Sequence, residues 1–361
     1  MSTIKSISTD ELVGDWASVS EPEYGWAMYR FPGTEKVYFM GGKTTEHSVD
    51  IEDFSGFVIA PFYDKDKKFR GIENTHHYSL TDIDVSKLEA SFSCNYSEHN
   101  PENGSTKEEY EKLVADVLNT IEKGTFQKAV PARSKQVKLS EDFSPFALFN
   151  SLLGTYPNAF VYLLSTPQTG SWIGCTPETL LKIKDQKLST LSLAGTRKSG
   201  SAGDFDFTSK ETEEQAIVTL YIHHILEQYC TEIEADGPHV INAGNVSHLA
   251  TYFSGQLKPG FQSDFLSIAR NLHPTPAVCG MPLMASRDFL LSHENFDRAL
   301  YSGFLGPVTS NSADLFVNLR CMQVFRHAAL LYAGAGVVKG SVPEKEWYET
   351  EEKMNTLQRF L

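Results

Sequence analysis

Basic residues and long apolar runs are both scarce in this sequence of 361 residues. There are 32 Lys and Arg against 46 Asp and Glu, which leaves a formal net charge of -14. Since nothing resembles a basic stripe, nucleic acid and anionic membrane surfaces are disfavoured as partners. No apolar run approaches the ~20 residues of a membrane-spanning helix, and the first residues lack the apolar stretch of a secretory signal. We therefore expect a cytoplasmic protein in which specific local cations would hold any anionic ligand.

Cysteine is also rare, and its five positions are widely scattered without a C-x-x-C pair: Cys94, Cys175, Cys230, Cys279 and Cys321. An odd, scattered set argues against a disulfide framework and against a structural zinc site. These residues are expected to be small buried hydrophobes. With 41% hydrophobic residues, a chain of this length can bury a large core and fold unaided.

The chain divides at a polar stretch over residues 97–105, which has the composition of a loop. Thr106 and Glu109 then form a capping-box pattern that predicts a helix running towards Lys123. We expect one large domain over residues 1–361, with an N-terminal scaffold portion over 1–100 and a motif-bearing catalytic portion over 101–361.

The elements predicted beyond this point follow a mixed order rather than a βαβ repeat. Residues Thr125–Leu139 have the pattern of a strand, and a hairpin is expected around Asp185 and Gln186. The segment Thr208–Tyr229 predicts a long helix, and Pro343 marks the first turn of a final helix. An α+β class with antiparallel sheet is favoured over a doubly wound fold.

Acidic residues recur at helical spacing on these two predicted helices. Glu211 and Glu214 lie three positions apart on the first helix, while Glu346, Glu349 and Lys353 follow spacings of three and four on the last. Two such faces could converge on a hard cation, and an all-oxygen ligand set suits Mg²⁺ better than zinc. The spacing alone is more typical of solvated helix faces with intrahelical ion pairs.

A series of short motifs follows in a fixed order between residues 110 and 361: Phe126–Arg133, Gly174–Glu178, Leu193–Thr196, Lys210–Val218, His248–Thr251, His273–Ala277, Leu319–Cys321, Ala333–Gly336 and Glu346–Thr350, with Lys353. Each motif is weak alone. Together they resemble the chorismate-utilising enzymes, which include isochorismate, salicylate, anthranilate and aminodeoxychorismate synthases. The resemblance implies an α+β fold, an α/β sandwich of two stacked antiparallel sheets with helices packed outside.

The resemblance also implies roles for individual residues. Lys128 matches the general base, which must be uncharged to take a proton, and Glu178 matches the general acid, whose proton a raised pKa would retain. Glu214 and Glu349 match the Mg²⁺ ligands, with Glu211 and Glu346 as supporting or water-mediated partners. The implied contacts to chorismate are Gly195, Thr196, His248, Ala277, Tyr301, Arg320, Gly334, Gly336 and Lys353. Without the resemblance, Lys128 would be interpreted as a surface lysine, Glu178 as a turn residue and Arg320 as part of a core ion pair.

Two positions favour one activity within the family. Anthranilate synthases place a glutamine where Lys128 stands and need ammonia from an amidotransferase, so no obligatory amidotransferase subunit is expected. Salicylate and aminodeoxychorismate synthases tend to carry a threonine in the segment that contains Ala277. The sequence therefore predicts a Mg²⁺-dependent isochorismate synthase, which converts chorismate by adding water at C2 and expelling the C4 hydroxyl. Salicylate or aminodeoxychorismate synthesis and a catalytically silent chorismate-binding protein remain alternatives, and either menaquinone or siderophore synthesis could use the product.

Overall fold

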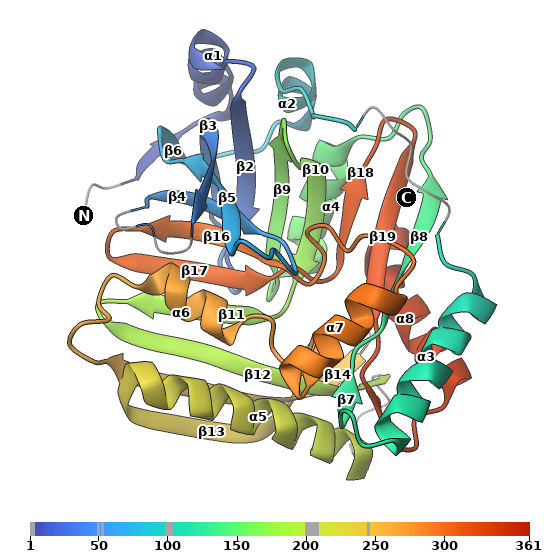
Figure 1. Cartoon of the computed structure of the whole chain (residues 1–361). Helices are drawn as coiled ribbons and strands as arrows, with labels where there is room; N and C mark the ends of the chain where they lie inside the picture. The colour runs from blue at the N-terminus through green and yellow to red at the C-terminus, as the bar shows by residue number, and fades with distance from the viewer. Residues whose placement is uncertain (1–3, 49–50, 52–53, 98–103, 199–208, 244–245) are drawn as a thin grey trace.

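The structure, a computed structural model, describes residues 4–48, 51, 54–97, 104–198, 209–243 and 246–361. Two large sheets and a small one carry the strands, and the helices lie around them (Figure 1). Strands of the two large sheets run in clearly different directions in this view, and α5 and α6 lie over the sheet that contains β12 and β13. No described helix has the length and apolar character needed to cross a membrane.

The first sheet consists of β1 (Lys5–Ile7), β2 (Tyr24–Arg30), β3 (Val37–Ser48), β6 (His76–Leu80), β8 (Ala132–Lys138), β9 (Phe160–Thr166), β10 (Gly170–Thr176), β18 (Cys321–Val324) and β19 (Ala328–Gly334). Its strand order is β1-β6-β3-β2-β9-β10-β18-β19-β8, and only the β1–β6 pair is parallel among these described strands.

The second sheet adds β4 (Gly56–Ala60), β5 (Lys68–Glu73), β11 (Thr179–Lys184), β12 (Lys187–Lys198), β13 (Cys230–Ala243), β14 (Val246–Leu257), β16 (Phe304–Thr309) and β17 (Ser312–Val317). It is antiparallel in the order β3-β5-β4-β16-β17-β11-β12-β14-β13. Strand β3 joins the two sheets, because its first half pairs with β2 and β6 and its second half with β5.

The two sheets pack face to face over an apolar layer rich in aromatic side chains. Phe160 of β9 stacks on Phe316 of β17 with ring centroids 4.1 Å apart, and Tyr29 packs against both Phe57 and Phe160. Aromatic pairs of this kind add specific geometry to the burial of a large apolar area. The predicted α+β class with stacked antiparallel sheets is confirmed.

The helices are α1 (Thr9–Val19), α2 (Val85–Ser91), α3 (Lys107–Glu122), α4 (Pro145–Thr155), α5 (Ser209–Tyr229), α6 (Phe265–Leu272), α7 (Leu283–His293) and α8 (Pro343–Gln358). Buried residues of α5 and α6 join the core on the outer face of the second sheet, and those of α4 and α8 join the core of the first. Helix α3 begins with the predicted capping box, in which Thr106 and Glu109 bond each other's main chain. Pro343 stands in the first turn of α8, as predicted.

The predicted single strand over Thr125–Leu139 is wrong. It is divided at Pro131 into β7 (Lys128–Ala129) and β8, which belong to different sheets. Proline lacks the N–H that a sheet interior requires, so the ladder cannot continue through it. Strand β7 instead forms the centre of a three-stranded sheet between β15 (Gly280–Met281) and β20 (Val337–Val338). This small sheet carries Lys128.

Both residues of the predicted hairpin turn, Asp185 and Gln186, have positive φ and join β11 to β12. Four of the five cysteines are buried and all are free, as predicted. Thr208, the predicted start of the long helix, lies outside the described residues. Strands from both portions pair with each other, as in β2–β9 and β4–β16, and the division near residue 100 stays a prediction.

Candidate active site

A small, partly open cavity of about 60 Å³ lies where β10, β11, β19 and α8 approach one another. Eight of the residues singled out from the sequence line it: Glu178, Glu214, Ala277, Tyr301, Arg320, Gly334, Gly336 and Lys353. These residues are separated by up to 175 positions along the chain, so the fold brings together what the sequence spreads out. The remaining lining is apolar apart from Tyr332: Val130, Pro177, Leu193, Ala194, Val278, Leu319 and Ala333.

Lys128 does not line this cavity; its side chain has no exposed surface and contacts Glu214, which does line it. Its Nζ is 2.9 Å from Oε1 of Glu214, an ion pair whose angles fall outside hydrogen-bond geometry. A buried ammonium needs such a partner, since desolvating a charge without one is costly. The backbone of Lys128 is held by Met281 and Val338 on the two neighbouring strands. Lys128 is therefore fixed by its sheet and has one acidic partner.

The Glu214 carboxylate approaches the main chain closely at Gly336. A Cβ added at Gly336 would lie 2.3 Å from Oε1 of Glu214, closer than real Cβ contacts allow. Glu214 itself is 9% exposed and lies near the start of α5. Gly336 therefore leaves the room that the Glu214 carboxylate occupies.

Glu178 occupies the junction between β10 and β11 and is 4% exposed. Burial raises the pKa of this carboxyl to about 7, although the positive charges of Lys128, Lys353 and Arg320 oppose the shift. Desolvation disfavours the ionised form, and here it outweighs the cations. A carboxyl that keeps its proton near neutral pH beside cationic groups is suited to donate that proton.

Helix α8 brings a second lysine and carboxylate to the site. Nζ of Lys353 lies 2.8 Å from Oε1 of Glu349 and donates a 2.8 Å hydrogen bond to the carbonyl of Gly334 on β19. Glu346 is buried on the same helix, one turn before Glu349. The helix is anchored by Arg133 of β8, whose guanidinium stacks 3.6 Å from the ring centroid of Trp347. This contact fastens α8 to β8, and Lys353 is the residue of α8 that lines the cavity.

Arg320 lines the cavity from the connection between β17 and β18, where its own φ is 48°. Within the described part of the chain, its guanidinium forms no hydrogen bond or ion pair. Non-glycine residues rarely adopt this left-handed conformation. In this conformation Arg320 contributes its cationic side chain to the cavity wall. The planar, permanently charged guanidinium is suited to bind a carboxylate through two parallel hydrogen bonds.

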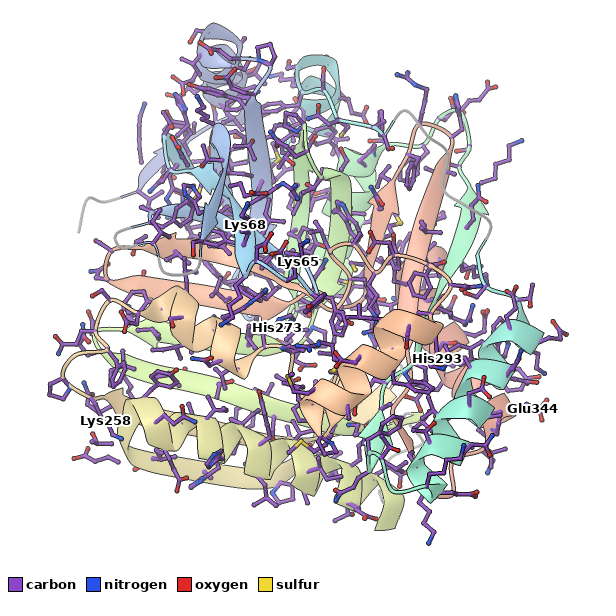
Figure 2. The ribbon with its side chains drawn as sticks, viewed as in Figure 1. Lys65, Lys68, Lys258, His273, His293 and Glu344 are labelled. Atoms are coloured by element: carbon purple, nitrogen blue, oxygen red, sulfur yellow. The ribbon has the colours of Figure 1, made fainter. Side chains whose placement is uncertain are left out.

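The segment after α6 supplies Ala277. Its first residue, His273, lies in the interior between α6 and α7 (Figure 2). Burial lowers the pKa of His273 to about 3, so the imidazole is neutral and its Nε2–H donates to the carbonyl of Ser302 at 2.7 Å. That bond ties the segment to the chain just beyond Tyr301. His273 is therefore a structural residue, and Ala277 is the member of this motif that reaches the cavity.

Several predicted residues do not reach the cavity lining. Gly195 lies on β12 with a φ of 68°, and a Cβ there would meet Glu211 at 2.9 Å. Neither Gly195 nor Glu211 lines the cavity, and the same holds for Glu346 and Glu349. The main chains of Thr196 and His248 are paired across β12 and β14, while their side chains lie outside the described part of the structure.

The donor chemistry near the cavity fits a hard divalent cation. Glu214 and Glu349 offer only oxygen atoms, which Mg²⁺ prefers, and Gly336 leaves room for the Glu214 carboxylate itself. Each carboxylate is paired with a lysine, Lys128 or Lys353. Across the described ranges, no three His, Cys, Asp or Glu side chains form a ready ligand cluster. An ion held here would therefore replace lysine contacts already present at Glu214 and Glu349.

Sequence reasoning missed a buried arginine and glutamate behind the cavity wall, Arg298 and Glu294. Both side chains are 4% exposed and form a bidentate ion pair, with Nε to Oε2 at 2.7 Å and Nη2 to Oε1 at 2.5 Å. Their spacing of four resembles any intrahelical pair, so the sequence offers no signal for their burial or their main-chain partners.

Comparison of the sequence with known protein families identifies the family to which this chain belongs. The profile of the family described as chorismate binding enzymes matches residues 54–361. The chain belongs to this family.

Relatives of this chorismate-binding chain include chloroplastic isochorismate synthase from Catharanthus roseus, 34% identical over 65% of this chain and 42% of that protein. The vibriobactin-specific isochorismate synthase of Vibrio cholerae is 29% identical over 69% of this chain and 66% of its own length. The matched part thus spans less than two thirds of either relative. A solved Bacillus anthracis structure, assigned as the 2,3-dihydroxybenzoate-specific isochorismate synthase DhbC, superposes with a TM-score of 0.78 and 25% identity, covering 97% of this chain and 98% of that one.

Proposed function

We propose that this chorismate-binding protein is an isochorismate synthase. The observation that carries the proposal is the meeting, at one cavity, of the buried Lys128–Glu214 pair, the buried carboxyl of Glu178, and Arg320, whose guanidinium has no hydrogen bond or ion pair among the described residues. The relatives named above are isochorismate synthases, which supports the same activity for this chain. The substrate would be chorismate, and the reaction an isomerisation.

The proposed reaction exchanges one hydroxyl position for another with no net change in atoms. Lys128 is ion-paired with Glu214 in the structure, so it must first lose a proton to solvent. The uncharged amine then removes a proton from a water molecule as that oxygen bonds to C2 of the ring. The ring double bonds shift, and the C4–O bond breaks as Glu178 protonates the departing hydroxyl, which leaves as water. Lys128 ends with one proton more and Glu178 with one fewer, and exchange with solvent restores both. Burial of Glu178 keeps its proton available near neutral pH.

Binding of the dianionic substrate is assigned to groups on three elements. Arg320 and Lys353 would hold the enolpyruvyl carboxylate, and Tyr301 with the glycines Gly334 and Gly336 would complete the wall. We assign Gly195, Thr196 and His248 to the substrate side of β12 and β14 on the basis of the motif resemblance.

Magnesium is proposed as the cofactor, held by Glu214 and Glu349 with Glu211 and Glu346 in support. When bound, Mg²⁺ would neutralise charge on the ring carboxylate. The residues of the chain do the remaining work, since Lys128 and Glu178 move the protons and Arg320 orients the substrate. We propose that residues 101–361 carry all of these groups and that residues 1–100 are scaffold.

The choice within the family depends on Lys128 and Ala277. A lysine at position 128 supports direct use of water without an amidotransferase subunit, and the small side chain of Ala277 supports hydration over pyruvate release. The proposal also includes a cytoplasmic location. The chain matches both a vibriobactin-specific isochorismate synthase and the isochorismate synthase MenF of Escherichia coli, and we propose that the product enters either siderophore or menaquinone synthesis.

The test is incubation of the purified protein with chorismate and Mg²⁺, followed by chromatography of the products. A mixture of chorismate and isochorismate without pyruvate is expected. Salicylate with stoichiometric pyruvate would move the assignment to salicylate synthase, and binding of chorismate without conversion would indicate a silent binding protein. Lys128→Ala and Glu178→Gln should each abolish conversion while leaving chorismate binding largely intact, and a near-normal rate in either variant would contradict the mechanism.

A further inference from the structure

Pro131 leaves an irregular stretch of main chain immediately after the residue proposed as the base. Strand β7 ends at Ala129 and β8 begins at Ala132, so Val130 and Pro131 lie in neither sheet. The carbonyl of Pro131 accepts hydrogen bonds from the Tyr110 hydroxyl and the Ala335 N–H. Buried main-chain groups need partners, so the carbonyl of Val130 and the N–H of Ala132 must find theirs elsewhere.

A single buried ion pair supplies both partners. Nη2 of Arg298 donates to the carbonyl of Val130 at 2.7 Å, and Oε1 of Glu294 accepts from the N–H of Ala132 at 2.8 Å. The two side chains also bond each other twice. The pair therefore holds the main chain on each side of Pro131, which fixes where β7 ends and β8 begins.

The same arginine reaches a second wall of the cavity. Nη1 of Arg298 donates to the carbonyl of Val278 at 3.1 Å, directly after Ala277. Val130 and Val278 both line the cavity, and the N–H of Val130 donates to Cys279 at 2.9 Å. One guanidinium thus connects the segment that follows Lys128 to the segment that follows Ala277.

We infer that Arg298 and Glu294 are positioning residues for the reaction. They set the location of Lys128 relative to the substrate wall formed by Ala277 and Val278, and they touch neither substrate nor reacting atoms. The inference rests on the proposed function. Its physical reason is that a small misplacement of a catalytic group lowers turnover strongly, whereas substrate binding at Arg320 and Lys353 stays intact.

Arg30 provides a matched control, because it is also 4% exposed and also donates to several main-chain carbonyls, those of Leu153, Tyr156 and Ala159. It lies on β2 and does not line the cavity. Replacing either arginine by lysine removes a buried multidentate donor and costs stability in the same way. Only the replacement of Arg298 disturbs the segment after Lys128.

The experiment compares Arg298→Lys, Glu294→Gln and Arg30→Lys with the wild type. Under the inference, the first two variants lower kcat by about 10- to 100-fold and change KM by less than about 3-fold, while Arg30→Lys stays within about 3-fold of the wild type in kcat. Amide hydrogen exchange over residues 130–135 should accelerate in Arg298→Lys and Glu294→Gln but not in Arg30→Lys. The double variant Arg298→Lys with Glu294→Gln should lose little more than the worse single variant, since the two act as one unit.

Equal loss of kcat in Arg298→Lys and Arg30→Lys at equal loss of Tm would overturn the inference, because the effect would then be general destabilisation. Unchanged exchange over residues 130–135 would overturn it as well. If the wild type does not convert chorismate, the proposed function fails. The exchange measurement distinguishes that failure from a failure of the inference, since it reports without any turnover whether the pair holds the main chain around Pro131.

Discussion

Nζ of Lys128 lies 2.9 Å from Oε1 of Glu214, with the lysine side chain wholly buried and that of the glutamate 12% exposed. The proposed base and a proposed metal ligand therefore share one ion pair. The same relationship recurs at Lys353 and Glu349, 2.8 Å apart. A divalent cation that uses either carboxylate must compete with an ammonium for it, and the two positive charges repel each other.

Replacing Lys128 by Met is expected to strengthen Mg²⁺ binding in the absence of chorismate. The substitution removes a competing cation from Glu214, and a gain of about ten-fold in affinity corresponds to ~1.4 kcal/mol. Isothermal titration with MgCl₂ measures this directly. Lys135→Met is the control, because Lys135 pairs with Glu351 at 2.8 Å away from the cavity and should leave affinity unchanged. Equal or weaker Mg²⁺ binding by Lys128→Met would show that the pair does not oppose the metal.

The buried carboxyl of Glu178 predicts a specific dependence of stability on pH. Its pKa is raised from 4.5 to about 7, so the folded state holds this proton more tightly than the unfolded state does. The stability that the protonated Glu178 carboxyl contributes is fully present below pH 4.5 and is lost as the pH rises through about 7. The loss is on the order of 3 kcal/mol above pH 8.

Glu178→Gln should therefore unfold at a higher temperature than the wild type at pH 8 and at about the same temperature at pH 4. Differential scanning calorimetry at both pH values measures the difference. Glu344→Gln serves as control, because Glu344 is exposed on α8 and its replacement should give no difference that grows with pH. If the difference in unfolding temperature between Glu178→Gln and the wild type shrank toward high pH, the raised pKa of Glu178 would be contradicted.

Arg320 is expected to act mainly in substrate binding. Arg320→Lys keeps the charge but loses the planar pair of donors, so KM for chorismate should rise about ten-fold, and Arg320→Met should raise it further. Steady-state kinetics at saturating Mg²⁺ provide the measurement. Arg326→Met is the matched control, since its guanidinium lies over the Tyr96 ring outside the cavity. An unchanged KM in Arg320→Lys together with a large fall in kcat would assign Arg320 to the chemical step instead.

Local signals in the sequence were sufficient for several elements. The capping box at Thr106 and Glu109 marks the start of α3 because both partners lie within four residues. The hairpin turn at Asp185 and Gln186 was predictable for the same reason. The division of the predicted strand over Thr125–Leu139 was not predictable from local signals. Pro131 lies inside an otherwise strand-like pattern, and whether it splits the strand depends on which sheets lie on either side of it.

In the candidate site, too, contacts between residues close in the sequence were predictable, and contacts between distant residues were not. Spacing alone puts Glu349 and Lys353 on one face of α8, where they form an ion pair. The contact of Arg298 with Val130 joins positions 168 residues apart, which no periodicity reveals. The roles of Lys128 and Glu178 came from motif resemblance, because a lysine in a strand and a glutamate after proline are ordinary on physical grounds alone.

Ala277 offers a test of product choice with an isosteric control. It lines the cavity, and the resemblance associates threonine in its segment with pyruvate release. Ala277→Thr adds a hydroxyl and a methyl group, whereas Ala277→Val adds nearly the same volume without a hydroxyl. If the hydroxyl promotes pyruvate loss, Ala277→Thr should release pyruvate at a rate at least about ten-fold above that of Ala277→Val, while both form isochorismate more slowly than the wild type because of crowding. A coupled lactate dehydrogenase assay measures pyruvate, and equal release from both variants would mean that the volume at position 277, not its hydrogen-bonding group, determines the product.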